Sequence, residues 1–177
     1  MNYKLLSLLF LFVLLFNSCK KLNSLTQFSL SFTETIIIPA STGINLPFNI
    51  LTPDIQSNSE ASFEIHDTRK DLIESIKMIQ MNLVLKSPSS ENFNFLKSIE
   101  LFMDADGLNE VKIASKLNMS NDNVQTVTLD VTNSELKEYI KKDKFSLRVA
   151  TTTDEAISQD YTIEINYVLF VDAKLKK

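Results

Sequence analysis

Most of the chain consists of short segments in which apolar and polar residues alternate. The longest runs from Tyr161 to Asp172, where alternate apolar side chains, beginning with Tyr161 and ending with Val171, share one face. A period of two is typical of β-strands that bury one face and expose the other. The same pattern predicts further strands at residues 28–33, 35–38, 61–65, 76–86, 126–131 and 145–150.

Two further alternating segments, Ser98–Met103 and Glu110–Ala114, are separated by a short polar stretch. This stretch, Asp104–Asn109, contains Gly107. A glycine supplies the positive φ that tight hairpin turns require. We therefore expect a β-hairpin whose turn lies at Asp104–Asn109.

Two short helices are expected among the strands. Thr132 and Glu135 have the spacing of a capping box, and an apolar stripe follows at residues 136–140. Residues 69–75 carry apolar positions at helical spacing and are expected to form a helical turn. This turn leads directly into the strand predicted at residues 76–86.

Eight or nine short strands with one or two short helices predict a single antiparallel domain over residues 28–177. We expect an all-β fold, an antiparallel β-sandwich of immunoglobulin-like type. A closed barrel is the alternative, but barrel corners usually need more glycine than the two in this chain. Residues 40–60 have no clear period and contain Pro47 and Pro53, so we expect there only an extended edge at residues 46–51.

The N-terminus has the layout of a secretory signal peptide. Lys4 supplies one positive charge, and residues 5–16 are apolar except for Ser7. A helix of this length extends only about 18 Å, against about 30 Å of hydrocarbon in a bilayer. The segment is therefore too short to span a membrane alone.

The cysteine at the end of this apolar run refines the interpretation. Phe16-Asn17-Ser18-Cys19 resembles the lipobox of bacterial lipoproteins, in which a small residue precedes the cysteine at the cleavage site of type II signal peptidase. The resemblance covers about the first twenty residues. It implies removal of residues 1–18, with diacylglycerol on the Cys19 sulfur and an acyl chain on its amine. Two or three acyl chains give a lasting anchor where one gives only marginal binding.

Cys19 has two other interpretations, a chance cysteine after an ordinary signal peptide and a buried core thiol. The lipoprotein interpretation is favoured because the only cysteine of the chain falls where the apolar run ends. Residues 19–27 then form a lipidated tether, of which residues 20–27 extend at most about 27 Å. Lys20 and Lys21 follow the cysteine with no acidic residue nearby. By the same resemblance, this predicts the outer membrane, with the domain facing the periplasm.

Composition excludes several classes of site and partner. One cysteine cannot form an internal disulfide, and one cysteine with one histidine cannot complete the common zinc sites. Two glycines leave no phosphate-binding loop of the GxxxxGK or GxGxxG type. The formal net charge of −4 argues against nucleic acid as a partner. We expect no cofactor.

Two polar clusters are candidates for chemistry. Asp104 and Asp106 could offer oxygen ligands to calcium, but the segment does not fit the EF-hand spacing, and a hairpin turn is favoured. His66 beside Asp67 could form a general base, but a polar strand-to-helix transition, with Asp67 or Thr68 as the helix cap, is favoured. We therefore predict no catalytic residue, no metal ligand and no enzyme activity.

The sequence leaves three functional hypotheses of unequal weight. The first is a lipid-anchored, non-catalytic envelope lipoprotein that binds or scaffolds another envelope protein. The alternative is a periplasmic carrier that holds a small apolar ligand in a cavity lined by Met78, Met81, Met103 and phenylalanines. The remote alternative is a hydrolase that uses carboxylates such as Asp104 and Asp106. Phe93 and Phe95, in the connection after residue 86, are expected to pack into the core.

Overall fold

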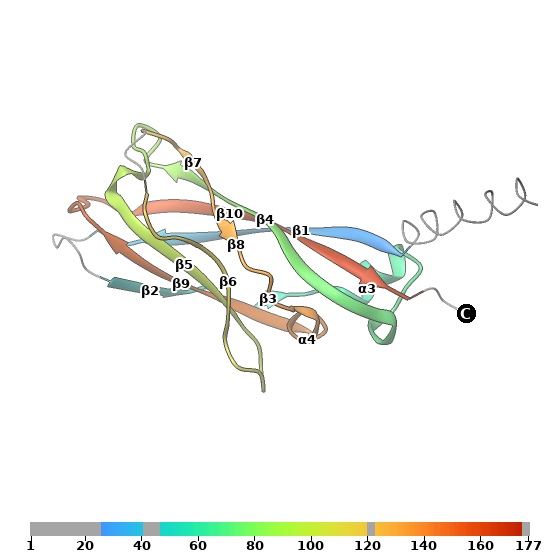
Figure 1. Ribbon diagram of the computed structural model, residues 1–177. Coiled ribbons are helices and arrows are strands. Elements are labelled where there is room, and N and C mark those ends of the chain that lie inside the picture. Colours follow the sequence, from blue (N-terminus) through green and yellow to red (C-terminus); the bar gives the residue numbers. More distant parts are fainter. Residues whose placement is uncertain (1–25, 41–46, 120–122, 175–177) are drawn as a thin grey trace, which may run out of the picture.

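The computed structural model describes residues 26–40, 47–119 and 123–174, which form two antiparallel sheets packed face to face (Figure 1). The first sheet consists, in spatial order, of β1 (Gln27–Ile38), β10 (Tyr161–Ala173), β4 (Ile73–Ser87) and β7 (Thr126–Thr128). The second consists of β2 (Pro47–Leu51), β9 (Lys144–Thr153), β5 (Leu96–Asp104), β6 (Val111–Lys116) and β8 (Asp130–Val131), with β3 (Ile55–Gln56) also paired to β9. The predicted all-β, antiparallel sandwich is confirmed.

The central strand β10 shows how the alternating pattern builds the core. Every second residue from Tyr161 to Ala173 is buried, and the residues between them are half-buried. The buried side chains pack in one apolar cluster with residues of the second sheet, such as Leu101 and Leu147. The strand and its buried face are therefore as the sequence predicts.

Several local predictions are also confirmed. β5 and β6 pair as an antiparallel hairpin, and Gly107 in its turn has a φ of 74°. The extended edge is β2, which pairs with β9. Phe93 and Phe95 belong to a 3-10 turn, η2 (Phe93–Phe95), and are 0% and 2% exposed. Both lie in the core, as expected.

The strand predicted at residues 61–65 is wrong, because this segment belongs to the helix α3 (Ser59–Ile65). The helix buries Ser59 and Phe63, four residues apart, on one face, and leaves Ile65 80% exposed. Five residues are too few to separate a period of two from a helical period in the sequence. The exposure of Ile65, two residues after the buried Phe63, shows that the period of two does not hold.

The strand predicted at residues 126–131 is divided between the two sheets. β7 pairs with β4 in the first sheet, whereas β8 pairs with β6 in the second. Leu129 lies at the crossing, is buried, and donates its N–H to the Met81 carbonyl at 2.9 Å. The alternation of apolar and polar residues continues from β7 to β8, because the inner faces of both sheets bury their apolar side chains in the same core.

The capping box predicted at Thr132 and Glu135 does not form. The helix α4 spans Lys137–Ile140, and the Thr132 hydroxyl donates instead to a backbone carbonyl of β6. The Glu135 carboxylate accepts from the Lys137 N–H at 3.0 Å, from the Ile76 N–H at 2.8 Å and from the Ser75 hydroxyl at 2.7 Å. Glu135 therefore joins the start of α4 to β4.

Two strand boundaries differ from the prediction. The helical turn expected at residues 69–75 is only the 3-10 turn η1 (Lys70–Leu72), and β4 begins at Ile73. The segments 28–33 and 35–38 form one strand, β1, without a break between them. Alternation continues through residue 34, because Glu34 lies on the same inward side of β1 as Leu30 and Ile36. The prediction divides the strand there because a glutamate replaces the apolar residue expected at that position.

Both ends of the described chain lie at the end of the sandwich next to α3 (Figure 1). There the Ala173 N–H donates to the Thr26 carbonyl at 3.1 Å. Within the described ranges, no helix has the length and apolar character needed to cross a bilayer. The predicted signal peptide, the lipobox and Cys19 lie outside the described residues.

Candidate functional site

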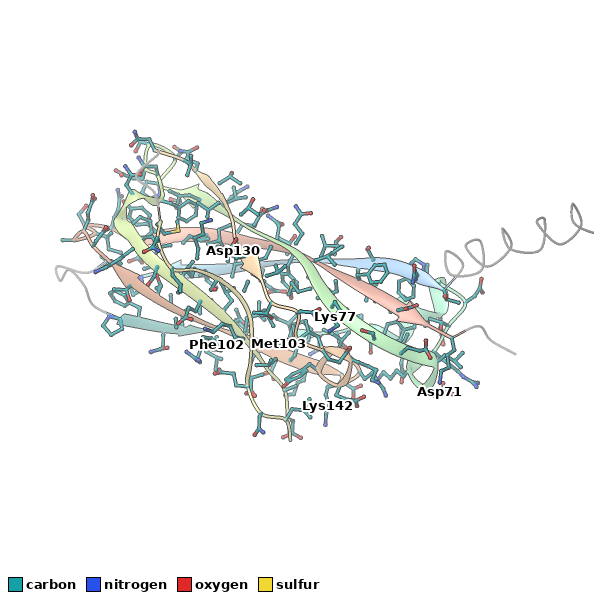
Figure 2. The ribbon with its side chains drawn as sticks, viewed as in Figure 1. Asp71, Lys77, Phe102, Met103, Asp130 and Lys142 are labelled. Atoms are coloured by element: carbon teal, nitrogen blue, oxygen red, sulfur yellow. The ribbon has the colours of Figure 1, made fainter. Side chains whose placement is uncertain are left out.

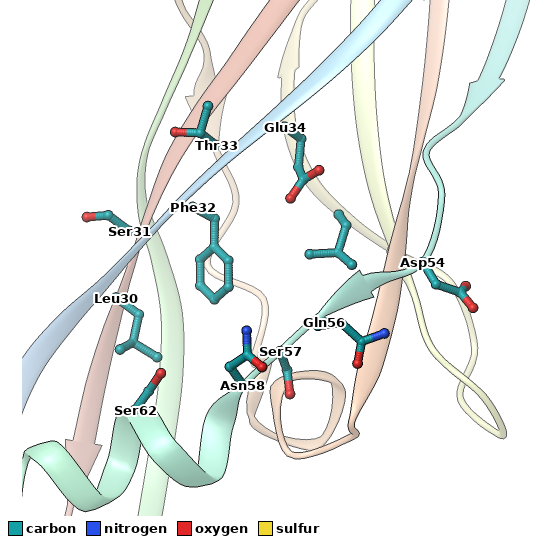
Figure 3. Close-up of a pocket in the computed structure, with 11 residues that line it drawn as sticks. Leu30, Ser31, Phe32, Thr33, Glu34, Asp54, Gln56, Ser57, Asn58 and Ser62 are labelled. Atoms are coloured by element: carbon teal, nitrogen blue, oxygen red, sulfur yellow. The ribbon is translucent and has the colours of Figure 1, made fainter.

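A cavity of about 470 Å³ opens at the edge of the sandwich, between β1 and the segment that leads from β3 into α3 (Figure 3). We call it the β1–β3 cavity. Residues 30–34 form one wall, and residues 54–58 with Ser62 form the other. β1 is the last strand of the first sheet in the described part of the chain, and β3 lies in the second sheet. The cavity therefore lies where the edges of the two layers face each other.

The alternation of β1 places two functional side chains in this cavity. Phe32 and Glu34 lie on the side of β1 that faces β3, whereas Ser31 and Thr33 point to the other side (Figure 3). Leu30 and Ile36, on the same side as Glu34, are buried in the core. Glu34 is thus a carboxyl group in a row of apolar side chains, which is the unusual feature of this strand.

Glu34 is half-buried and has no hydrogen-bond or ion-pair partner in the part of the chain that the structure describes. Burial disfavours its charged form and raises the pKa of the carboxyl group above its ordinary value. Burial is the only cause of this rise in pKa, and no cation among the described residues opposes it. The carboxyl group is therefore available to a ligand.

Tyr167 lies in the interior behind Phe32. It is the register partner of Phe32 on β10, and the two rings stack with 5.2 Å between centroids and 9° between planes. The side chain is 1% exposed, and its hydroxyl has no hydrogen-bond partner among the described residues. Burial and the charge of Glu34 raise the pKa of Tyr167. A buried hydroxyl without a partner costs about 1–3 kcal/mol. Tyr167 is not among the residues that line the cavity.

The opposite wall is held in place by backbone contacts. The Ser57 hydroxyl donates to the Lys142 carbonyl at 2.6 Å, which ties this wall to the end of α4. Asn58 has a φ of 46°, in the left-handed region, and its side chain does not cap α3. Figure 3 shows the Asn58 amide directed toward the ring of Phe32. This conformation leaves the amide free for the cavity.

A second, smaller hollow of about 240 Å³ lies on the other side of the same wall. It shares residues 56–58 with the β1–β3 cavity and adds Glu60, Lys70 and Asp143. Lys70 bridges these two acids at 3.4 and 3.3 Å. The charged groups of this hollow therefore satisfy one another, unlike Glu34.

Of the predicted candidates, Asp104 is the last residue of β5 and Asp106 lies in the β5–β6 turn, and both are exposed. They are not among the residues that line the β1–β3 cavity. No group of three or more His, Cys, Asp or Glu side chains able to hold a metal occurs within residues 26–40, 47–119 and 123–174. The structure therefore brings no further acidic ligand to this turn.

His66 terminates α3, and its ring stacks on that of Phe28 with 4.0 Å between centroids. Asp67, the next residue, has a φ of 53° and donates its N–H to the Glu64 carbonyl. The pair thus forms the C-terminal end of α3, and the strand-to-helix transition expected here is wrong: a helix precedes the pair, and Arg69, not Asp67 or Thr68, is the N-cap of the 3-10 turn that follows.

Met78, Met81 and Met103, proposed as the lining of an apolar ligand site, are buried in the core at 3%, 0% and 0% exposure. Other residues line both of the hollows described above. Met103 is the inward neighbour of Phe102 on β5 (Figure 2). These methionines pack the two sheets together.

Polar side chains surround Phe102 on the outer face of the second sheet. The Arg148 guanidinium lies 4.1 Å from the Phe102 ring centroid and donates twice to the Glu110 carboxylate, each time at 2.6 Å. It also donates to the Asn49 side chain at 2.8 Å. These hydrogen bonds hold the pKa of Glu110 below its usual value. The groups satisfy one another and leave no free charge for a ligand.

The sequence reasoning missed the β1–β3 cavity. The signal that could have revealed it is the interruption of an apolar row by Glu34 between Phe32 and Ile36. A buried polar residue is more informative than a buried apolar one, because it must be satisfied or functional.

No protein-family model and no curated protein sequence matches this chain. Similar solved structures include the cyanophage Pam1 capsid, with a TM-score of 0.42 and 7% identity over 82% of this chain and 86% of that chain. N-glycanase F (PNGase F) has a TM-score of 0.41 and 9% identity over 79% of this chain, which spans 41% of that enzyme's chain. The Clostridium perfringens domain CpGH89CBM32-5, solved with GalNAc-β-1,3-galactose, has a TM-score of 0.33 and 15% identity over 75% of this chain and 94% of that chain. These distant similarities supply no functional argument.

Proposed function

We propose that the protein is a lipid-anchored, non-catalytic binding module of the bacterial envelope, which holds its ligand in the β1–β3 cavity. The observation that carries this proposal is the carboxyl group of Glu34, which lines that cavity and has no partner among the described residues. Aromatic, amide and charged groups converge there from both sheets. Such convergence in a concave site is typical of ligand binding.

The anchoring part of the proposal rests on the sequence. Phe16–Cys19 resembles a lipobox, and β1 begins at Gln27, a few residues later. A tether of this length would keep the domain within about 27 Å of the membrane. Lys20 and Lys21 after the cysteine support placement on the outer membrane, facing the periplasm.

The cavity can be tested by blocking it. Ser62 lines the cavity from α3, whereas Glu64 is exposed on the same helix and lies outside the lining. We expect Ser62→Trp to fill the cavity and Glu64→Trp to leave it open. Full-length protein in nonionic detergent is immobilised, envelope extract is passed over it, and retained molecules are identified by mass spectrometry.

The expected result is a molecule that the wild type and Glu64→Trp retain and that Ser62→Trp loses. Equal retention by Ser62→Trp would place the binding site elsewhere and contradict the proposal. Thermal unfolding of both tryptophan variants serves as the check that the fold is intact.

A further inference from the structure

The charge balance of the β1–β3 cavity indicates what kind of ligand it takes. Glu34 and Asp54 are the ionisable residues among those that line it, and both are acids. Asp54 forms an ion pair with Lys144. Glu34 is therefore the one charge of the described lining that no protein group compensates.

A partly desolvated carboxylate gains most from a cation that brings its own hydrogen-bond donors. A neutral hydroxyl would supply a hydrogen bond but no compensating charge, and an anionic ligand would be repelled. A divalent metal such as calcium takes six to eight oxygen ligands, and one unpaired carboxylate does not supply that shell. An organic cation meets these conditions best.

The other residues that line the cavity indicate which groups the ligand carries beside its charge. Leu30, Phe32 and Ile55 present apolar groups beside the carboxyl group, which suits the methylene stem of an alkylamine. The lining also offers side-chain oxygens, among them those of Gln56 and Asn58. An ammonium group has three N–H donors, enough for Glu34 and two such oxygens.

We propose that the β1–β3 cavity binds a primary alkylammonium group, with the charge on Glu34 and the methylene stem against Phe32. This inference rests on the proposed function, because it assumes that the cavity is the ligand site. The same chemistry occurs in free diamines and in lysine side chains, and the experiment distinguishes these two sources.

Isothermal titration calorimetry with full-length protein in nonionic detergent provides the test. The probes are cadaverine, Nα-acetyl-lysine methylamide and Nα-acetyl-norleucine methylamide, which keeps the stem of lysine but lacks its ammonium group. We expect at least one of the two amines to bind and the norleucine probe to bind at least tenfold more weakly than the lysine probe, or not at all. Tighter binding of cadaverine would indicate a free diamine, and tighter binding of the lysine probe a protein side chain.

Two variants test whether Glu34 is the group that binds the ammonium charge. Glu34→Gln should weaken the binding of the amine at least tenfold, whereas Glu64→Gln, which removes an exposed acid of α3 outside the cavity, should leave it unchanged. A melting temperature of Glu34→Gln no lower than that of the wild type shows that the loss is not due to unfolding. Undiminished amine binding by Glu34→Gln would overturn the inference.

The other outcomes separate this inference from the proposed function. Equal binding of the lysine and norleucine probes would show an apolar site and overturn selection of the ammonium group. If neither amine binds, but Ser62→Trp still abolishes retention of an envelope molecule, the ligand class is wrong and the cavity remains the ligand site. If retention is also unaffected by Ser62→Trp, both proposals fail.

Discussion

The ring of Tyr167 stacks on that of Phe32 with 5.2 Å between centroids, and the Tyr167 hydroxyl is buried without a partner in the described structure. The two residues are register partners on neighbouring strands, so the pair links the core to the wall of the β1–β3 cavity. Stacking explains why an aromatic ring is needed at position 167, but it does not explain the hydroxyl. The ring and the hydroxyl of Tyr167 therefore contribute separately to this position.

Tyr167→Phe separates these two roles. The variant keeps the stacked ring and removes a buried group that has no partner, so the free energy of unfolding should be unchanged or raised by up to about 1 kcal/mol. Tyr167→Ala, the contrasting variant, removes the ring and should lower it by about 3–5 kcal/mol. Urea denaturation measures both. A marked loss of stability in Tyr167→Phe would show that the hydroxyl has a structural partner.

Glu34→Gln should change how stability depends on pH. Burial raises the pKa of Glu34 in the folded state above the ordinary value of 4.5, so the folded state binds more protons than the unfolded state near that pH. The contribution of this group is therefore greatest below about pH 4 and decreases as pH rises through the folded-state pKa. Glutamine does not ionise, so the variant should lose less stability over this range.

The measurement for this prediction is the difference in free energy of unfolding between wild type and Glu34→Gln from about pH 4 to pH 7. The difference should move in favour of the variant as pH rises. Glu64→Gln, on the exposed face of α3, serves as the control and should show little pH-dependent difference. A difference between wild type and Glu34→Gln that stays constant with pH would show that the carboxyl group is not desolvated.

Glu135→Ala should detach α4 from β4. Although burial alone would raise the pKa of Glu135, the hydrogen bonds from Ile76, Ser75 and the Lys137 N–H lower it overall. A lowered pKa means that this stabilisation is present at neutral pH and is lost as pH falls through the folded-state value. Loss of these hydrogen bonds should lower the free energy of unfolding by about 1–2 kcal/mol at pH 7.

The control for this prediction is Glu138→Ala, because Glu138 lies on the same helix and forms only surface ion pairs with Lys137 and Lys141. Its effect should stay below about 0.5 kcal/mol. Equal effects of the two substitutions would mean that the Glu135 hydrogen bonds do not hold the helix in place.

Cys19→Ser tests the anchor. A serine cannot carry the thioether-linked diacylglycerol, so the variant should leave the membrane fraction and lose incorporation of labelled palmitate. Ser24→Ala, within the predicted tether, is the matched control and should remain membrane-bound. Retention of Cys19→Ser in the membrane fraction would contradict lipidation as the means of attachment.

Much of the fold is predictable from sequence because the period of two reports directly which side of a strand is buried. The alternating pattern does not predict the structure of a segment when two different local structures fit the same sequence. The segment that forms α3 is too short to reveal its period, and the crossing at Leu129 is invisible because both sheets face one core. The sequence places Glu135 in a capping box that does not form, because its carboxylate binds β4, a strand about sixty residues away in sequence.

The β1–β3 cavity could not be predicted because its two walls are distant in sequence and belong to different sheets. The exception is Glu34, whose position in an apolar row marks it without any structure. A charged residue at an inward position of a predicted strand is therefore worth testing as a site even when no motif surrounds it.

The central claim is that the β1–β3 cavity is the ligand site of this protein. Nuclear magnetic resonance of 15N-labelled full-length protein in nonionic detergent, titrated with envelope extract, tests it most directly. The account predicts backbone amide shifts concentrated in residues 30–34 and 55–62, and their loss in Ser62→Trp. Shifts confined to other regions, such as the turn at residues 104–109, or shifts that persist in Ser62→Trp, would contradict it.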